Sequence, residues 1–219
     1  MPHPAFPSDF FGSSGLPRFP WIWFGGQLVS LGPVPDPKLT ESSHRFGGPI
    51  PMPWTKLPRH LRLHGVLDLD PRRLGLPLPA RLTQAVRLPL VFPVRHSGAE
   101  IVYDVGAEGR LHLVEGPKSR PDPDWPVPDY PDIIPPRPLV AQAPIPMPLD
   151  GLRPKRGGST GSVQDFPEHA ERFLLVVVTA NETDLGFSLM GPDAEDSALQ
   201  LVFLIGPDTG RIWAYNQCT

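Results

Sequence analysis

Proline is the feature of this sequence that most restricts its fold. The chain has 33 prolines in 219 residues, roughly three times the average usage. A helix bundle is excluded, because proline inside a helix costs about 3 kcal/mol, and collagen is excluded because the glycines follow no three-residue period. With 40% hydrophobic and only 20% charged residues, the chain is too apolar to be disordered throughout. We therefore expect a compact protein of strands and loops.

The prolines are unevenly distributed. Residues 1–37 hold eight, 49–93 hold nine, 117–154 hold thirteen and 155–219 hold three. The segment 117–154 is therefore predicted to be a polyproline-like, semi-rigid connector that is not a core element. We predict one domain over 1–219, made of an N-terminal part (1–116), the proline-rich arm with a flexible linker (117–162) and C-terminal strands (163–219).

Alternating and apolar runs predict the strands. Trp21–Phe24 and Gln27–Leu31 flank Gly25-Gly26, which is the pattern of a tight β-hairpin. The apolar run Phe173–Thr179 indicates a central strand covered on both faces. More strands are predicted at Leu185–Met190, Ala198–Ile205 and Arg211–Gln217, the last two as a hairpin with Ile205 opposite Ile212.

The remaining elements complete a β-rich α+β fold. Short helices are predicted at 36–43, 79–86 and 167–172. Residues 88–115 read as a three-stranded meander in which Tyr103 faces His112 and Glu100 faces Glu115. The fold class is then α+β with antiparallel sheets, either a bent sheet or a two-sheet sandwich, and a long proline-rich connector.

One polar strand face is a candidate site. Residues 60–70 alternate between leucines and polar side chains, which predicts a half-buried strand with a bulge at Gly65. His60, His64 and Asp68 would share its polar face, where imidazoles and carboxylates could bind metal or transfer protons. The same alternation also fits a solvated face without any site. We expect no structural metal there.

Recognisable catalytic motifs are missing from the sequence. It contains no HExxH or GxGxxG, and the basic residues of Lys155–Ser162 precede the glycines, unlike a phosphate-binding loop. The close Glu100–Glu115 pair would resemble the carboxylates of a glycosidase, but like charges opposite one another destabilise a strand pair. The single cysteine, Cys218, excludes a cysteine zinc site. We therefore expect a non-enzymatic protein without cofactors.

Charge and targeting signals point to the cytoplasm. The net charge is −3, and no basic face indicates a nucleic-acid partner. Residues 1–20 lack the pattern of a signal peptide. The longest apolar run, at 173–178, is too short to span a bilayer.

Aromatic and basic residues outside the expected core are candidate contacts for a protein partner. Such side chains dominate interface energetics when they are exposed. The candidates are Trp54, Arg95, His96, Trp125 and Tyr130. Trp125 and Tyr130 lie among prolines, so the same rings could instead dock onto their own domain and hold the arm in place.

Two segments give the chain a distant resemblance to the YwqG-like family of bacterial proteins. Arg45-Phe-Gly-Gly followed by Ile50-Pro and Trp54, then Leu63–Asp70 and Leu88–Phe92, follow the order of that family over about residues 40–115. The resemblance implies a cytoplasmic, strand-rich fold without established catalytic residues. Some members resemble proteins encoded beside bacterial toxins, which implies an immunity role.

The leading hypothesis is a non-enzymatic binding module, most concretely a bacterial immunity protein that neutralises a cognate toxin by direct binding. One alternative is a metal-dependent or acid–base enzyme that uses His60, His64 and Asp68. A second is a structural component of a larger assembly. Neither nucleic acid nor a membrane is expected as a partner.

Overall fold

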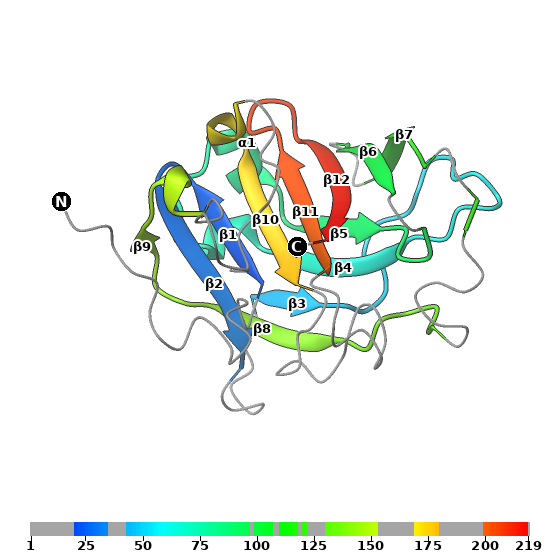
Figure 1. Ribbon diagram of the computed structural model, residues 1–219, viewed down its shortest axis with the longest axis horizontal. Helices are drawn as coiled ribbons and strands as arrows, with labels where there is room; N and C mark the ends of the chain where they lie inside the picture. Colours follow the sequence, from blue (N-terminus) through cyan, green and yellow to red (C-terminus); the bar gives the residue numbers. More distant parts are fainter. Residues whose placement is uncertain are drawn as a thin grey trace.

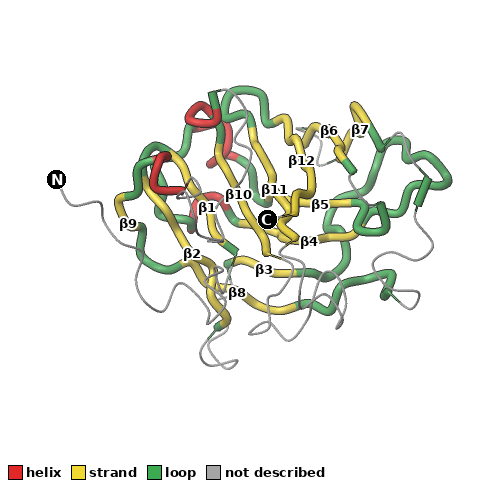
Figure 2. The backbone as a smooth tube through the Cα atoms, viewed as in Figure 1, coloured by secondary structure: helices red, strands yellow, loops and turns green. Residues whose placement is uncertain are grey.

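Strands make up most of the regular structure (Figure 2). The computed structural model describes residues 20–34, 43–96, 99–106, 110–117, 120–121, 130–152, 169–179 and 199–218. The strands are β1 (Trp21–Phe24), β2 (Gln27–Pro33), β3 (His44–Phe46), β4 (His64–Leu69), β5 (Leu88–Phe92), β6 (Glu100–Val105), β7 (Leu111–Glu115), β8 (Arg137–Ala141), β9 (Ile145–Pro146), β10 (Leu174–Thr179), β11 (Leu199–Ile205) and β12 (Arg211–Cys218). The helical elements are α1 (Ala80–Gln84) and the 3-10 turns η1 (Pro71–Arg73), η2 (Leu149–Leu152) and η3 (Ala170–Arg172). The prediction of a β-rich chain with few short helices is confirmed.

The described strands form one antiparallel sheet that curls into a half-barrel. Their order is β5-β4-β3-β8-β2-β1-β10-β11-β12-β6-β7, with β9 beside β2. In Figure 1, β3, β4, β5 and β8 run across the direction of β1, β2, β10, β11 and β12. Of the two expected architectures, the structure has the bent sheet.

Two hairpins form as their sequences predict. In the first, Gly25 and Gly26 both have positive φ, 57° and 80°, as a two-residue turn that matches strand twist requires. Phe24 therefore pairs directly with Gln27. In the second, Ile205 pairs with Ile212 across β11 and β12.

The central strand is covered on both faces, as expected. β10 lies between β1 and β11, and every residue from Leu174 to Val178 is buried. One face packs into the large core inside the curl, and the other packs into a second cluster that contains Trp21 and Trp23. The segment from β9 to η2 covers this second cluster, where the Trp23 indole Nε1 donates to the Met147 carbonyl oxygen over 2.7 Å.

Tyr103 links the two ends of the curled sheet. It lies on β6, whereas β5 is the first strand in the sheet order. The buried Tyr103 hydroxyl donates to the Pro89 carbonyl (3.2 Å) and accepts from the Val91 backbone N–H (3.0 Å), both on β5. Burial raises the pKa of Tyr103, so the hydroxyl stays protonated and satisfies backbone groups at this edge.

The three-stranded meander is wrong in its first pairing and in its register. β6 and β7 do pair, but β5 pairs with β4, and β6 pairs with β12. The β6–β7 ladder starts at Val105 opposite Leu111 and is irregular after Tyr103, so Tyr103 faces Leu113 and Asp104 faces His112. Because Glu100 faces Tyr215 and Glu115 faces Val102, the proposed carboxylate pair does not form.

The proline-rich segment is also more integrated than predicted. β8 lies between β3 and β2 inside the sheet. Ile134, Leu139 and Met147 of this segment are buried in the core clusters. Proline has no backbone N–H to donate. The segment still pairs with its neighbouring strands through its backbone carbonyls and the N–H groups of its other residues.

Other predictions have mixed outcomes. The short helix at 79–86 and the helical turn at 167–172 correspond to α1 and η3. The predicted helix at 36–43 lies outside the described residues except for residue 43. The predicted strand at 185–190 lies wholly outside them. No helix within the described ranges has the length and apolar character needed to cross a membrane.

Candidate functional site

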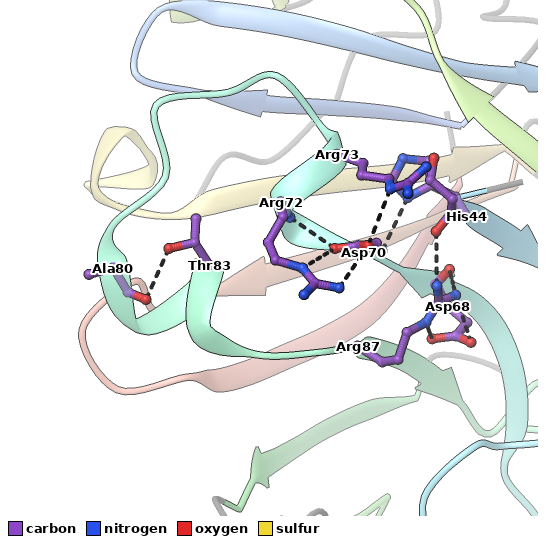
Figure 3. A network of polar contacts seen from close by, with 9 residues as sticks. His44, Asp68, Asp70, Arg72, Arg73, Ala80, Thr83 and Arg87 are labelled. Atoms are coloured by element: carbon purple, nitrogen blue, oxygen red, sulfur yellow. Dashed lines mark hydrogen bonds and ion pairs between the residues drawn. The ribbon is translucent and has the colours of Figure 1, made fainter. Parts of the chain in front are cut away.

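Two buried aspartates mark one end of β4. Asp68 lies near the end of the strand and Asp70 directly after it, so their side chains point to the same side of the chain. Both residues are 6% exposed. Figure 3 shows arginines reaching both carboxylates, with His44 close by. Carboxylates this buried need charged partners, and four arginines supply them.

Asp68 is held by Arg87 and Arg45. Arg87 Nε donates to Asp68 Oδ1 over 2.9 Å, and its Nη2 lies 2.8 Å from Oδ2. The same guanidinium donates to the backbone carbonyls of Asp68 and Ser43, each over 2.9 Å. Arg45 Nη2 adds a contact of 3.3 Å to Oδ2. Arg87 thus joins β3 to β4 with each of its guanidinium nitrogens engaged.

Asp70 is held by the turn that follows it. It is the N-cap of η1, with Pro71 at the first helical position, and Oδ1 accepts from the Arg72 backbone N–H over 3.1 Å. The Arg72 side chain donates twice, from Nε to Oδ1 (2.9 Å) and from Nη2 to Oδ2 (3.1 Å). Arg73 Nε lies 3.8 Å from Oδ2. Hydrogen bonds from Arg72 lower the pKa of Asp70 against the opposing effect of burial.

His44 lies beside both aspartates and is neutral. Its Nδ1 accepts a hydrogen bond from the Asp70 backbone N–H over 3.2 Å, so the ring proton is on Nε2. The ring is fully buried. Burial lowers the pKa of His44 to about 4. His44 therefore adds no charge near neutral pH.

A glycine turn positions Arg45. After the buried Phe46, Gly47 and Gly48 adopt positive φ (64° and 85°), and their N–H groups donate to the carbonyls of Val66 and Ile134. A Cβ on Gly48 would lie 2.9 Å from Arg45 Nε. Arg45 folds back over this glycine and donates to the Pro49 carbonyl over 3.0 Å. Arg45 is directly opposite Asp68 in the β3–β4 ladder, and the absence of a side chain at Gly48 leaves room for its guanidinium.

These contacts define a cationic surface, the arginine cluster, made of Arg45, Arg72, Arg73 and Arg87. Four guanidiniums against two aspartates leave a formal charge of +2 while His44 is neutral. The Arg45 and Arg87 side chains are 30% and 29% exposed, whereas those of Arg72 and Arg73 are 53% and 52% exposed. The Asp70 half of the cluster therefore faces solvent.

The other end of β4 is closed by the proline-rich segment. His64 Nε2 lies 3.2 Å from the Pro131 carbonyl oxygen, and the Tyr130 ring meets the His64 ring edge-on, with centroids 5.3 Å apart. Arg95 Nη2 donates to the Tyr130 carbonyl over 2.7 Å. Burial lowers the pKa of His64 and raises the pKa of Tyr130. This end consists of contacts within the domain.

The predicted polar face of His60, His64 and Asp68 is therefore wrong. β4 lies between β3 and β5, and five of its six residues are buried, with His64 covered by Tyr130 and Asp68 by Arg87. His60 is exposed and precedes the strand, while His64 and Asp68 have separate partners at opposite ends of β4. The irregularity after Gly65 is confirmed.

Most of the predicted partner contacts are engaged within the domain. His96 and Tyr130 are buried, at 1% and 4% exposure, and Arg95 supports the Tyr130 backbone. Trp54 is half-buried and packs edge-on against Tyr103, with centroids 5.8 Å apart. Trp125 lies outside the described residues. Of the two alternatives for Tyr130, the structure has the ring docked onto its own domain, against His64 of β4, while His96 is buried and not exposed as a partner contact would require.

The sequence analysis missed the arginine cluster. Its one local signal is Asp70-Pro71-Arg72-Arg73, an N-cap aspartate and a first-turn proline followed by two bases. Arg45 and Arg87 carry no such signal, since they reach Asp68 from 23 and 19 residues away. Only the sheet topology brings them together.

The site offers no arrangement for a metal. Across the described part of the chain, no three His, Cys, Asp or Glu side chains gather closely enough to hold an ion. No family model, curated protein or solved structure matches this chain. The resemblance to the YwqG-like family stays a prediction.

Proposed function

We propose that this protein is a non-enzymatic protein-binding module whose contact surface includes the arginine cluster. The observation that carries the proposal is the exposure of Arg72 and Arg73, each about half exposed while anchored to the buried Asp70. Arginine is enriched among the residues that dominate interfaces. A side chain already held in place loses less rotamer freedom when a partner binds.

The charge of the cluster indicates the kind of partner. The whole chain carries −3, whereas the cluster carries +2 while His44 is neutral. Opposite potentials steer association and suppress wrong partners. A partner with an acidic surface fits this patch.

The concrete form that we propose is a cytoplasmic immunity protein that neutralises a cognate toxin by direct binding. Its support is the resemblance of the segment around Arg45-Phe-Gly-Gly to a family in which some members resemble proteins encoded beside bacterial toxins. An acidic contact surface on the toxin follows from the cluster, and this form of the proposal excludes toxins that present only basic surfaces.

The enzyme alternative has less support. His64 contacts the Pro131 carbonyl, and Asp68 is neutralised by Arg87. A general acid or base needs reach to a substrate proton, and both groups are already bound within the fold. His60 is exposed, apart from the other two.

Co-expression with the products of the neighbouring genes tests the proposed function. The expected result is that one neighbour arrests growth alone and co-purifies with this protein when growth is restored. An Arg72→Gln/Arg73→Gln variant should lose protection while it stays folded. The matched control is Arg59→Gln/Arg62→Gln, which removes the same charge from two exposed positions. If the wild-type protein does not restore growth with any neighbouring gene product, the immunity proposal is contradicted.

A further inference from the structure

We propose that Arg72 and Arg73 form a carboxylate-binding site that takes a glutamate or aspartate side chain from an acidic segment of the partner. The inference rests on the proposed function and specifies the group recognised. Its basis is the contrast between a guanidinium that is fully engaged and one that is half engaged.

Arg72 has an unused half of its guanidinium. The Nε and Nη2 atoms bind the two oxygens of Asp70, and Asp70 is the one partner of this side chain within the described residues. A guanidinium carries five N–H donors. The Nη1 hydrogens and the second Nη2 hydrogen form another fork, which faces away from Asp70. That fork has the geometry for bidentate contact with a second carboxylate.

Asp70 acts as a positioning residue for this fork. It binds both the backbone N–H and the side chain of Arg72, so the first turn of η1 and the guanidinium are fixed together. It also lies within ion-pair distance of Arg73, at 3.8 Å. The two basic side chains are therefore gathered over one buried carboxylate.

The neighbouring Arg87 shows that this scaffold already uses such forks for carboxylates. Arg87 binds Asp68 through Nε and Nη2, and its Nη1 is occupied by the Ser43 carbonyl. Its side chain is 29% exposed. All three guanidinium nitrogens of Arg87 thus have partners within the fold. Arg72 makes the same two contacts to a carboxylate through Nε and Nη2, but its Nη1 has no partner among the described residues.

A carboxylate is favoured over a nucleic-acid phosphate. Nucleic-acid backbones require a run of basic contacts along a face, but the cluster has an excess of only two charges in an acidic chain. A planar fork binds a planar carboxylate through two parallel hydrogen bonds. An acidic peptide segment therefore fits best.

Fluorescence anisotropy with a defined probe tests the site. The probe is a short labelled peptide of alternating glutamate and glycine, and its glutamine–glycine counterpart is the neutral control. We expect the acidic peptide to bind the full chain at low salt and Arg72→Gln/Arg73→Gln to weaken binding by about tenfold or more. Arg59→Gln/Arg62→Gln, with the same charge change, should stay within about twofold, since charge effects between exposed groups are small.

Asp70→Asn separates positioning from charge. Asparagine keeps the N-cap, so the variant should fold, and removal of a negative charge makes the cluster more positive. A positioning role predicts weaker peptide binding despite this charge. Stronger binding would overturn the positioning role of Asp70. Melting curves provide the check on folding.

The remaining outcomes are also decisive. Equal losses in both arginine pairs, or no peptide binding at all, would overturn the carboxylate site. Displacement of the peptide by polyphosphate at far lower concentration than by free acidic peptide would reassign it to phosphate. Peptide binding with no toxin protection leaves the site standing and contradicts the proposed function, whereas protection that is insensitive to Arg72 and Arg73 does the reverse.

Discussion

The two ends of β4 use similar polar side chains in opposite ways. At the first end, His64 is covered by Tyr130 and Pro131, and Arg95 donates to a backbone carbonyl of the covering segment. At the second end, the Asp70 carboxylate is held by the side chains of Arg72 and Arg73, which are about half exposed. The first end is covered by a packed segment of the chain, whereas the carboxylate at the second end is paired with charged side chains.

This difference teaches where recognition can occur in such a fold. Polar groups beneath a packed segment stabilise the fold and are not accessible to a partner. Polar groups paired with half-exposed arginines keep a charged surface, and exposed ion pairs contribute little to stability.

Tyr130→Ala should destabilise the protein by about 3–5 kcal/mol, because truncation of a buried aromatic loses burial and leaves a cavity. Tyr130 is 4% exposed and contacts His64. Urea unfolding measures the loss. The control is Ile133→Ala, since Ile133 is 53% exposed in the same segment, and it should cost under about 0.5 kcal/mol. Equal midpoints for the two variants would contradict a closed first end.

Acid should destabilise both ends through their buried histidines. Burial lowers the pKa of His44 to about 4 and also lowers the pKa of His64. Below about pH 6.5 the two histidines are protonated in the unfolded chain but not in the folded state. The unfolding free energy is therefore highest above that pH and falls as the pH drops toward 4. For His44 the shift corresponds to roughly 3 kcal/mol at most.

The unfolding free energy measured between pH 7 and pH 4.5 checks this window. His44→Gln should flatten the pH dependence and lower the stability at pH 7. A wild-type profile that is already flat over this range would show that His44 is accessible to water. That result would contradict the buried geometry of the second end.

Asp68→Asn should cost about 2 kcal/mol. Removal of one partner from a fully buried ion pair costs about 3–5 kcal/mol, and we expect less here because Arg45 and Arg87 are 30% and 29% exposed. Asp208→Asn, at an exposed turn position, makes the same chemical change and should be near neutral. Thermal melts of the pair measure the difference, and equal melting temperatures would mean that Asp68 is solvated.

Gly48→Ala and Gly26→Ala form a matched pair for the position of Arg45. Both glycines have positive φ, 85° and 80°, so alanine at either costs about 1–2 kcal/mol in backbone strain. Only at Gly48 would the new Cβ meet a neighbour, Arg45 Nε at 2.9 Å. We expect the Gly48 variant to be the less stable by under about 1 kcal/mol, since a flexible arginine can move. Identical unfolding midpoints would contradict the packing of Arg45 over the turn.

Sequence reasoning succeeded where structure is local. The Gly25-Gly26 turn and the Ile205–Ile212 pairing follow from short-range alternation and turn residues. It failed where pairing partners are distant, as for β6 with β12 and for β8 between β2 and β3. His64 and Asp68 are covered by Tyr130 and Arg87, which are also distant in sequence, so the alternation at 60–70 gave no sign of their burial.

The same distinction holds for the candidate site. Asp70 and Arg72 are two residues apart, and their cap could be predicted from the sequence. The Asp68–Arg87 pair is 19 residues apart and forms because β4 and β5 pair. No local pattern encodes such a contact.

The most direct test of the account compares Arg72→Gln with Arg87→Gln in two measurements, unfolding free energy and affinity for the acidic peptide. The two residues differ in how much of the guanidinium the fold uses. We expect Arg87→Gln to lower the unfolding free energy more than Arg72→Gln does, whereas Arg72→Gln alone weakens peptide binding. A loss of stability in Arg72→Gln equal to that in Arg87→Gln, with peptide affinity unchanged, would contradict it.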